Sequence, residues 1–157
     1  MTNRVAFENL KILLADDNPG MANTMGAFMR VMGVEQFENC TNGERALERF
    51  SDQSWNLVIT DYNMAPMDGL TLMENIRHRR FGQAARIPAI MITGYTDTNR
   101  IVAAQKLGIS QILRKPFGIQ EIQDRIEWCM KNPITFVLDG DRYIPADAKA
   151  RRVQNIA

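Results

Sequence analysis

The chain has 157 residues, of which 45% are hydrophobic and 24% are charged, a composition typical of one globular domain with a buried core. Its formal net charge of +1 gives no global preference for nucleic acids or anionic membranes. No apolar run approaches the roughly 18 residues that a membrane span needs. Residues 1–9 lack the apolar centre of a signal peptide. Cys40 and Cys129 lack metal-ligand spacing, so we expect buried thiols in a cytoplasmic protein.

Strands and helices are predicted to alternate along the chain. Short apolar runs, typical of strands buried on both faces, predict strands at 12–15, 34–40, 55–60, 87–93 and 109–114. Helical spacing and capping residues predict helices at 18–32, 43–50, 68–79, from 96 or 97 to 107, and 118–131. Such alternation indicates an α/β fold with a parallel sheet and right-handed crossovers.

Polar side chains stand where four of these strands end. Asp16 and Asp17 follow the first strand, Asp61 follows the third, Thr93 ends the fourth, and Lys115 follows the fifth. In an open α/β sheet the carboxyl ends of the strands line one crevice, and ligands bind there. We therefore expect these five residues to meet in one small acidic pocket. Taken singly, each has an ordinary structural reading as a helix cap, a β-branched filler or a solvated lysine.

The combination suits phosphoryl chemistry. Three carboxylates can hold Mg²⁺, which binds one or two carboxylates and often bridges to phosphate oxygens. The central carboxylate of Asp61 could act as a nucleophile and become an aspartyl phosphate. Lys115 could pair with the new phosphate, and the hydroxyl of Thr93 could donate a hydrogen bond to it.

These motifs together resemble those of response-regulator receiver domains from two-component signalling, of the free-standing type. The segments that carry the resemblance are Asp16-Asp17, Asp61-Tyr62-Asn63-Met64-Ala65-Pro66-Met67-Asp68-Gly69, Met91-Ile92-Thr93-Gly94 and Lys115-Pro116-Phe117. The resemblance covers about residues 10–131, so we assign 1–131 to the receiver domain. It implies a flavodoxin-like, doubly wound sheet of five parallel strands in the order 2-1-3-4-5, with five helices.

The resemblance also implies roles for the site residues. Asp61 would accept a phosphoryl group from a histidine kinase or a histidine phosphotransfer protein. Mg²⁺ would be held by Asp17, Asp61 and the main-chain carbonyl of Asn63, with Asp16 reaching it through water. Thr93 would be the switch hydroxyl and Lys115 the lysine that pairs with phosphate.

The chain departs from the family pattern at two places. Ala65 stands where proline is usual and Pro66 follows one residue later, so we expect an altered loop beside an intact site. Ile112 stands where many members carry the tyrosine or phenylalanine that rotates inward on activation. Tyr95 could replace that aromatic, or it could simply cover the pocket.

The favoured function is a phosphorylation-controlled signalling module rather than an enzyme. It would act on an unidentified protein target, without direct nucleic-acid contact, and could form a homodimer through the fourth helix, fifth strand and fifth helix. One alternative is a Mg²⁺-dependent aspartyl-phosphate phosphatase or phosphotransferase. Such enzymes usually need an acid/base aspartate where this chain has Asn63. A second alternative is a degenerate receiver that acts without phosphorylation. A third, a nucleotide-binding flavodoxin-like protein, is the weakest alternative because no glycine-rich loop follows the first strand.

Residues 132–157 form a C-terminal extension. Apolar residues at 134–138, a turn at 139–141 and a second run at 142–144 fit a small hairpin. A segment that docks on the domain, or on a partner, fits equally well. Residues 146–157 are polar and are expected to be a mobile tail.

Overall fold

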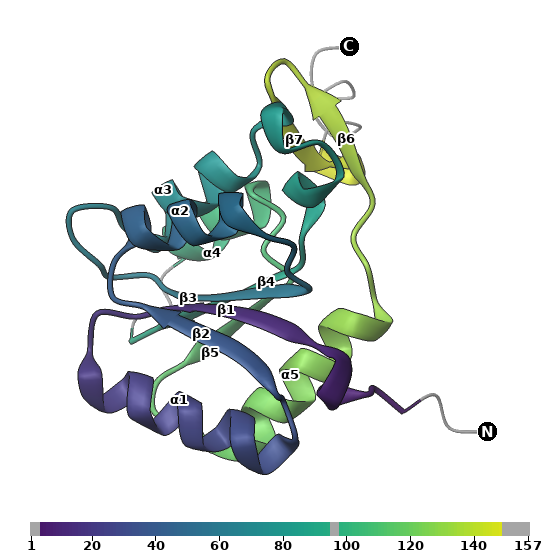
Figure 1. Cartoon of the computed structure of the whole chain (residues 1–157). Helices are drawn as coiled ribbons and strands as arrows, with labels where there is room; N and C mark the ends of the chain where they lie inside the picture. The colour runs from purple at the N-terminus through teal and green to yellow at the C-terminus, as the bar shows by residue number, and fades with distance from the viewer. Residues whose placement is uncertain (1–3, 95–97, 149–157) are drawn as a thin grey trace.

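The computed structural model describes residues 4–94 and 98–148 (Figure 1). A parallel sheet in the order β2-β1-β3-β4-β5 lies at its centre, which confirms the predicted flavodoxin-like fold. Its strands are β1 (Lys11–Ala15), β2 (Gln36–Cys40), β3 (Leu57–Asp61), β4 (Ala89–Thr93) and β5 (Gln111–Arg114). Among the described residues, no helix is long and apolar enough to cross a membrane.

In the part of the chain that the structure describes, an α-helix follows each strand of the sheet, as predicted: α1 (Pro19–Met32), α2 (Gly43–Asp52), α3 (Gly69–Ile76), α4 (Thr98–Lys106) and α5 (Ile119–Lys131). Two short 3-10 helices, η1 (Phe7–Asn9) and η2 (Arg79–Arg86), were not predicted. The expected start of the fourth helix at 96 or 97 lies outside the described residues.

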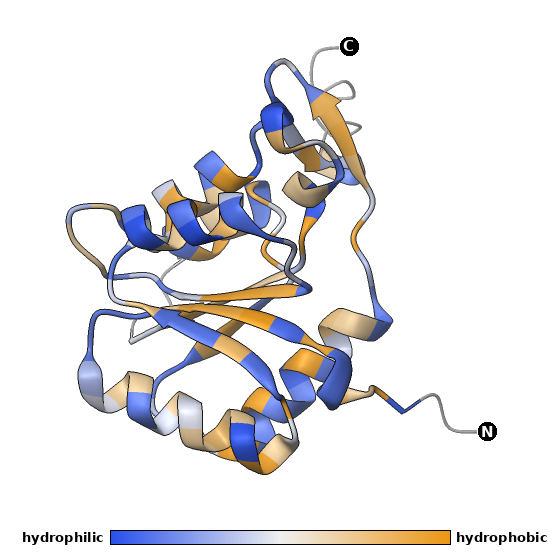
Figure 2. Cartoon of the chain, viewed as in Figure 1, coloured by the Kyte–Doolittle hydropathy of each residue, from blue (hydrophilic) through white to orange (hydrophobic). Residues whose placement is uncertain are grey.

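The sheet is covered on both faces, as its apolar strands require. Helices α1 and α5 lie on one face, and α2, α3 and α4 lie on the other (Figure 1). The central strands β1 and β3 are largely hydrophobic, whereas β2, at an edge of the sheet, is largely hydrophilic (Figure 2). Alternate strand residues divide between the two cores, so that Leu13 and Val58 face α2 and α3, whereas Ile12 and Leu57 face α1 and α5.

Four strands begin two residues later than their apolar runs predicted. The main-chain N–H groups of Val34, Ile87 and Ile109 donate to carbonyl oxygens at the end of the preceding helix instead of to a neighbouring strand. These three side chains are nevertheless buried. An apolar run in the sequence therefore marks where side chains become buried, and the hydrogen bonds between strands begin about two residues later.

The extension forms a two-stranded antiparallel hairpin of β6 (Phe136–Asp139) and β7 (Arg142–Pro145). Phe136 and Ile144 are each only 6% exposed, so the hairpin buries apolar side chains on the domain. The segment therefore forms a hairpin, and this hairpin docks on the domain, so the two expectations are compatible. Of the tail predicted to be mobile, residues 149–157 lie outside the described residues.

The third helix was predicted to run to residue 79, and this is wrong, because α3 ends at Ile76. The next residues pair with the hairpin in an extended arrangement. The N–H of Tyr143 donates to the carbonyl oxygen of Arg77 (2.8 Å), the N–H of Arg79 donates to that of Asp141 (2.7 Å), and His78 bridges to Arg142. Partners more than sixty residues away therefore end the helix, and a local pattern cannot show them.

Candidate functional site

Three carboxylates meet at the carboxyl ends of β1 and β3. Asp61 is the last residue of β3, and Asp16 and Asp17 follow β1, which is its neighbour in the sheet. One carboxylate oxygen from each residue lies within 4.8 Å of the others. The predicted acidic cluster is thus brought together by parallel pairing of the two strands.

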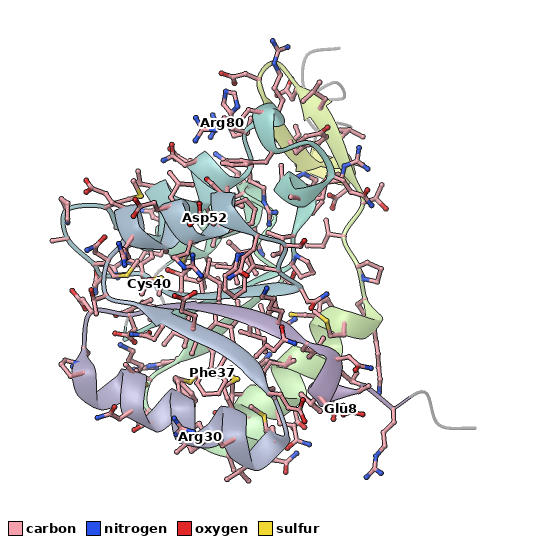
Figure 3. The ribbon with its side chains drawn as sticks, in the orientation of Figure 1. Glu8, Arg30, Phe37, Cys40, Asp52 and Arg80 are labelled. Carbon is pink, nitrogen blue, oxygen red and sulfur yellow. The ribbon has the colours of Figure 1, made fainter. Side chains whose placement is uncertain are left out.

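Asp16 is fixed in this cluster by hydrogen bonds at its main chain and at one side-chain oxygen. Its N–H donates to the carbonyl oxygen of Cys40 (3.0 Å), which stands at the end of β2 (Figure 3). Its Oδ1 accepts from the N–H of Asn18 (2.9 Å), but its buried Oδ2 has no hydrogen-bond partner among the described residues. Burial raises the pKa of Asp16, and the hydrogen bond from Asn18 opposes that rise.

This donor set fits a hard divalent cation. Asp16 and Asp61 are only 6% and 5% exposed, whereas Asp17 is exposed and open to ligands from solvent. Buried carboxylates in mutual contact repel one another, and an oxygen without a partner bears the full cost of its burial. A cation held by carboxylate oxygens and water would relieve both costs.

Lys115 follows β5, which lies on the opposite side of β3 from β1 in the sheet. Its Nζ lies 3.2 Å from Asp61 Oδ2, and the side chains of Lys115 and Asp61 are 26% and 7% exposed. The main-chain N–H of Lys115 also donates to the carbonyl oxygen of Thr93 (2.9 Å). Asp61 therefore stands between an acidic pair and a cation.

Thr93 and Asn63 were also predicted in the site. Thr93 is the last residue of β4, next to β3 in the sheet, and is 3% exposed. Asn63 is exposed, two residues after Asp61. The role of its main-chain carbonyl as a metal ligand stays a prediction, as does the role of the Thr93 hydroxyl.

The loop between β3 and α3 folds back tightly onto the site. The N–H of Gly69 donates to the carbonyl oxygen of Tyr62 (2.9 Å), and a Cβ atom at Gly69 would overlap the carbonyl oxygen of Asp61. Only glycine permits this approach. The altered stretch of this loop contains a cis peptide bond between Ala65 and Pro66, and the carboxylates beside it still converge.

Ile112 stands where many family members carry an aromatic residue, and it packs against the core. Its side chain is half-buried and lies on the α2, α3 and α4 face. Gly94 is exposed, and a side chain there would meet open space. Tyr95, the predicted alternative, lies outside the described residues.

Two contacts, one at each end of α4, were not predicted. The guanidinium of Arg100, on α4, lies 4.2 Å from the ring centroid of Tyr62, the residue that follows Asp61. At the other end of α4, the fully buried guanidinium of Arg77 bonds to the carbonyl oxygen of Leu107 (2.8 Å). No local sequence signal marks either arginine, because exposed helix surfaces carry arginines routinely.

The chain is similar in sequence to known chemotaxis proteins. The chain is 28% identical over 120 residues to the chemotaxis protein CheY-3 of Vibrio cholerae, covering 76% of this chain and 91% of that protein. It is also 28% identical to a probable chemotaxis protein CheY of Rhizobium etli, covering 76% of this chain and 92% of that protein.

Solved structures are similar in fold. The chemotaxis response regulator CheY4 of Vibrio cholerae superposes with a TM-score of 0.69 at 22% identity, covering 75% of this chain and 96% of that one. The receiver domain of the sensor histidine kinase PA1611 from Pseudomonas aeruginosa gives 0.66 at 26% identity, with 76% and 96% covered. The family model of the response regulator receiver domain matches residues 12–127, which include all six predicted site residues. The chain therefore belongs to the response regulator receiver domain family.

Proposed function

We propose that this protein is a phosphorylation-controlled response regulator of a two-component system. Asp61 accepts a phosphoryl group from a histidine kinase or a histidine phosphotransfer protein, and the phosphorylated chain signals by contact with another protein. One observation carries the proposal: the Asp61 carboxylate lies among two further carboxylates and 3.2 Å from the Lys115 ammonium. Cytoplasmic location follows from a kinase donor of this class.

In the transfer, a carboxylate oxygen of Asp61 forms a bond to phosphorus as the P–N bond of the donor phosphohistidine breaks. The leaving imidazole keeps the electron pair of that bond. Lys115 then pairs with a phosphoryl oxygen. It gives up its pairing with Asp61, because the phosphorylated carboxyl group no longer carries a negative charge. The hydroxyl of Thr93, at the end of the adjacent strand, donates a hydrogen bond to another phosphoryl oxygen.

Magnesium fits this site as a cofactor. Asp17, Asp61 and the main-chain carbonyl of Asn63 would hold it, with Asp16 bound through water. When bound, it neutralises the negative charge that gathers as the phosphoryl group arrives. The similar PA1611 receiver domain was solved with a magnesium ion coordinated in its active-site cleft, which supports this assignment.

The enzyme alternative is disfavoured by Asn63. An amide cannot donate and accept the proton that a phosphatase of this type moves in each turnover. The homodimer through α4, β5 and α5 stays part of the proposal. Experiment must distinguish the proposed function from the other alternative, a degenerate receiver that acts without phosphorylation.

The test is the intact mass of the whole chain after incubation with acetyl phosphate and Mg²⁺. The wild type should gain one phosphoryl group that is lost in base, and Asp61→Asn should gain none. Asp124→Asn, an equivalent change on the exposed side of α5, should behave as wild type. A wild type that gains nothing would support the degenerate receiver, and an Asp61→Asn variant that gains the group would show that another residue is the acceptor.

A further inference from the structure

Arg77 is a buried cation at the C-terminal end of α3. Its side chain is 0% exposed, and its guanidinium donates to the carbonyl oxygens of Ala85 (2.8 Å), Ile87 (2.7 Å), Leu107 (2.8 Å) and Gly108 (3.2 Å). Burial lowers its pKa to about 9, so it stays protonated at neutral pH. No carboxylate pairs with it in the part of the chain that the structure describes. Four carbonyl oxygens therefore satisfy this charge, two of them in the turn between α4 and β5.

The hairpin completes the surroundings of this arginine. The ring of Phe136, on β6, lies 4.4 Å from the Arg77 guanidinium. Gly108 has a φ of +70°, and a Cβ atom there would overlap the Phe136 ring, so the ring lies directly against the turn that ends α4. On β7, Tyr143 donates its N–H to the carbonyl oxygen of Arg77 (2.8 Å). Arg77 thus contacts the end of α4 with its side chain and the hairpin with both its side chain and its main chain.

The other end of α4 is in contact with the phosphoacceptor segment. Arg100, in the first turn of α4, has its guanidinium 4.2 Å from the ring of Tyr62. Tyr62 follows Asp61 and donates its N–H to the carbonyl oxygen of Ile92 (2.8 Å). Helix α4 has nine residues, which is about 14 Å of helix. It therefore runs from the segment that follows Asp61, at the carboxyl ends of the strands, to the turn that rests against Phe136 of the hairpin.

The hairpin does not pack along the length of α4. A cleft of about 990 Å³ lies between them, lined by Val102 and Lys106 on the helix and by Ile134, Ile144 and Ala148 in the extension. The hairpin meets the turn after the helix at Gly108, against the ring of Phe136. Its main-chain bonds to the domain are made with Arg77 and Arg79 rather than with α4.

We propose that the hairpin is a docked regulatory element whose Arg77–Phe136 contact holds the end of α4 in its unphosphorylated position, so that phosphorylation of Asp61 weakens docking. This inference rests on the proposed function of Asp61. A displacement of the end of α4 that carries the Leu107 and Gly108 carbonyls with it would cost Arg77 two of its four carbonyl acceptors. Because coupling between two sites is reciprocal, loosening the hairpin must also favour phosphorylation. Ile112 cannot act as the usual rotating aromatic, and α4 offers another route from the site.

Hydrogen exchange of the whole wild-type chain tests the first half of this coupling. The amides of Arg79 and Tyr143 report on docking because they bond across the hairpin junction, and the amide of Val34, bonded to Met29 at the end of α1, is the internal control. Acetyl phosphate with Mg²⁺ should speed exchange at the two junction amides by about five-fold or more, the lower end of typical coupling. Exchange at Val34, and at all three amides in Asp61→Asn, should stay unchanged.

A substitution tests the second half. Phe136→Leu keeps an apolar side chain but removes the ring from Arg77, so the equilibrium constant for phosphoryl transfer from acetyl phosphate to Asp61, measured by intact mass at a fixed ratio of acetyl phosphate to acetate, should rise several-fold. Phe81→Leu is the matched control, because that ring lies near a different arginine, Arg80, at 4.7 Å. Its equilibrium constant should equal that of wild type.

The outcomes separate the two proposals, because intact mass is measured on the same samples. A chain that carries the phosphoryl group on Asp61 but shows unchanged exchange at Arg79 and Tyr143 overturns the hairpin proposal and leaves the proposed function standing. Equal equilibrium constants for wild type and Phe136→Leu, or an equal rise in Phe81→Leu, also overturn it. A chain that gains no phosphoryl group overturns both.

Discussion

The Nζ atom of Lys115 lies 3.2 Å from the Oδ2 oxygen of Asp61, although 54 positions separate the two residues in sequence. The pairing occupies one oxygen of the carboxylate that the proposed metal and the proposed phosphoryl group would both use. Under the proposed function, Lys115 would compete with a cation for Asp61 before transfer and would pair with the phosphoryl oxygens after it.

Lys115→Met should therefore bind Mg²⁺ more tightly than wild type, by several-fold, because the metal no longer meets a positive charge beside Asp61. Calorimetric titration of the whole chain measures this. Lys131→Met, at the end of α5, removes an equal charge away from the site and should leave the affinity unchanged. Weaker binding in Lys115→Met would contradict the competition.

Asp17→Asn should weaken the binding of Mg²⁺ or Mn²⁺, because it removes one of three clustered carboxylates. Wild-type affinity should be in the range of about micromolar to millimolar, since the metal keeps several waters. Glu127→Gln, on α5, is the control for loss of one negative charge and should bind like wild type. Equal affinities for the two variants would reject the metal site.

Gly69→Ala should destabilise the fold by about 1–3 kcal/mol, because the new Cβ overlaps the carbonyl oxygen of Asp61 and the loop must shift. Gly26→Ala should instead stabilise it by about 0.5–1 kcal/mol, since alanine favours the middle of α1 and the nearest atom, of Arg30, lies at an ordinary 3.5 Å. Urea unfolding measures both free energies. Effects of the same sign would show that the close approach at Gly69 is not the cause.

Arg77→Lys should lower the free energy of unfolding by about 2–4 kcal/mol, although it keeps the charge. A lysine ammonium cannot reach four carbonyl oxygens that lie around a planar guanidinium, so buried acceptors lose their donors. Arg79→Lys, the same change at an exposed neighbour, should be nearly neutral. Thermal or urea unfolding of the pair decides whether the four bonds matter.

Burial raises the pKa of the Cys129 thiol from 9.0 to about 11, against a hydrogen bond with Ser110 that lowers it. Between these values the unfolded chain loses the thiol proton while the folded chain keeps it. The free energy of unfolding should then fall as pH rises through this window, by at most about 1.4 kcal/mol per pH unit from this thiol. Cys129→Ala should fall less steeply across the same window, and identical slopes would show that the thiol does not contribute.

Local patterns predict the sheet and the site because both follow from strand ends. Asp61 and Lys115 each stand at the end of a strand in one parallel sheet, so their meeting needs only the strand order. The family resemblance supplies that order, and the observed pairing of β4 with both β3 and β5 confirms it. The starts of the strands are harder to predict, since Val34 and Ile87 are buried without joining the ladder.

The surroundings of Arg77 could not be predicted in this way. In sequence, Arg77 opens a run of basic residues with His78, Arg79 and Arg80, which resembles the solvated end of a helix. Its acceptor at Leu107 lies 30 positions away, and the ring that covers it belongs to the extension. Hydrophobic periodicity carries no information about such partners, so the end of α3 was placed too late.

The segment shared with the family ends at residue 127, yet the cover of a buried cation within that segment is Phe136. The boundary of homology is therefore not a boundary of folding. Without the hairpin, a charged side chain in the interior would face water or a void, and the turn after α4 would lose the surface it rests on. We therefore expect the unphosphorylated receiver and its extension to unfold together, and a chain shortened at the family boundary to have a lower free energy of unfolding than the whole chain.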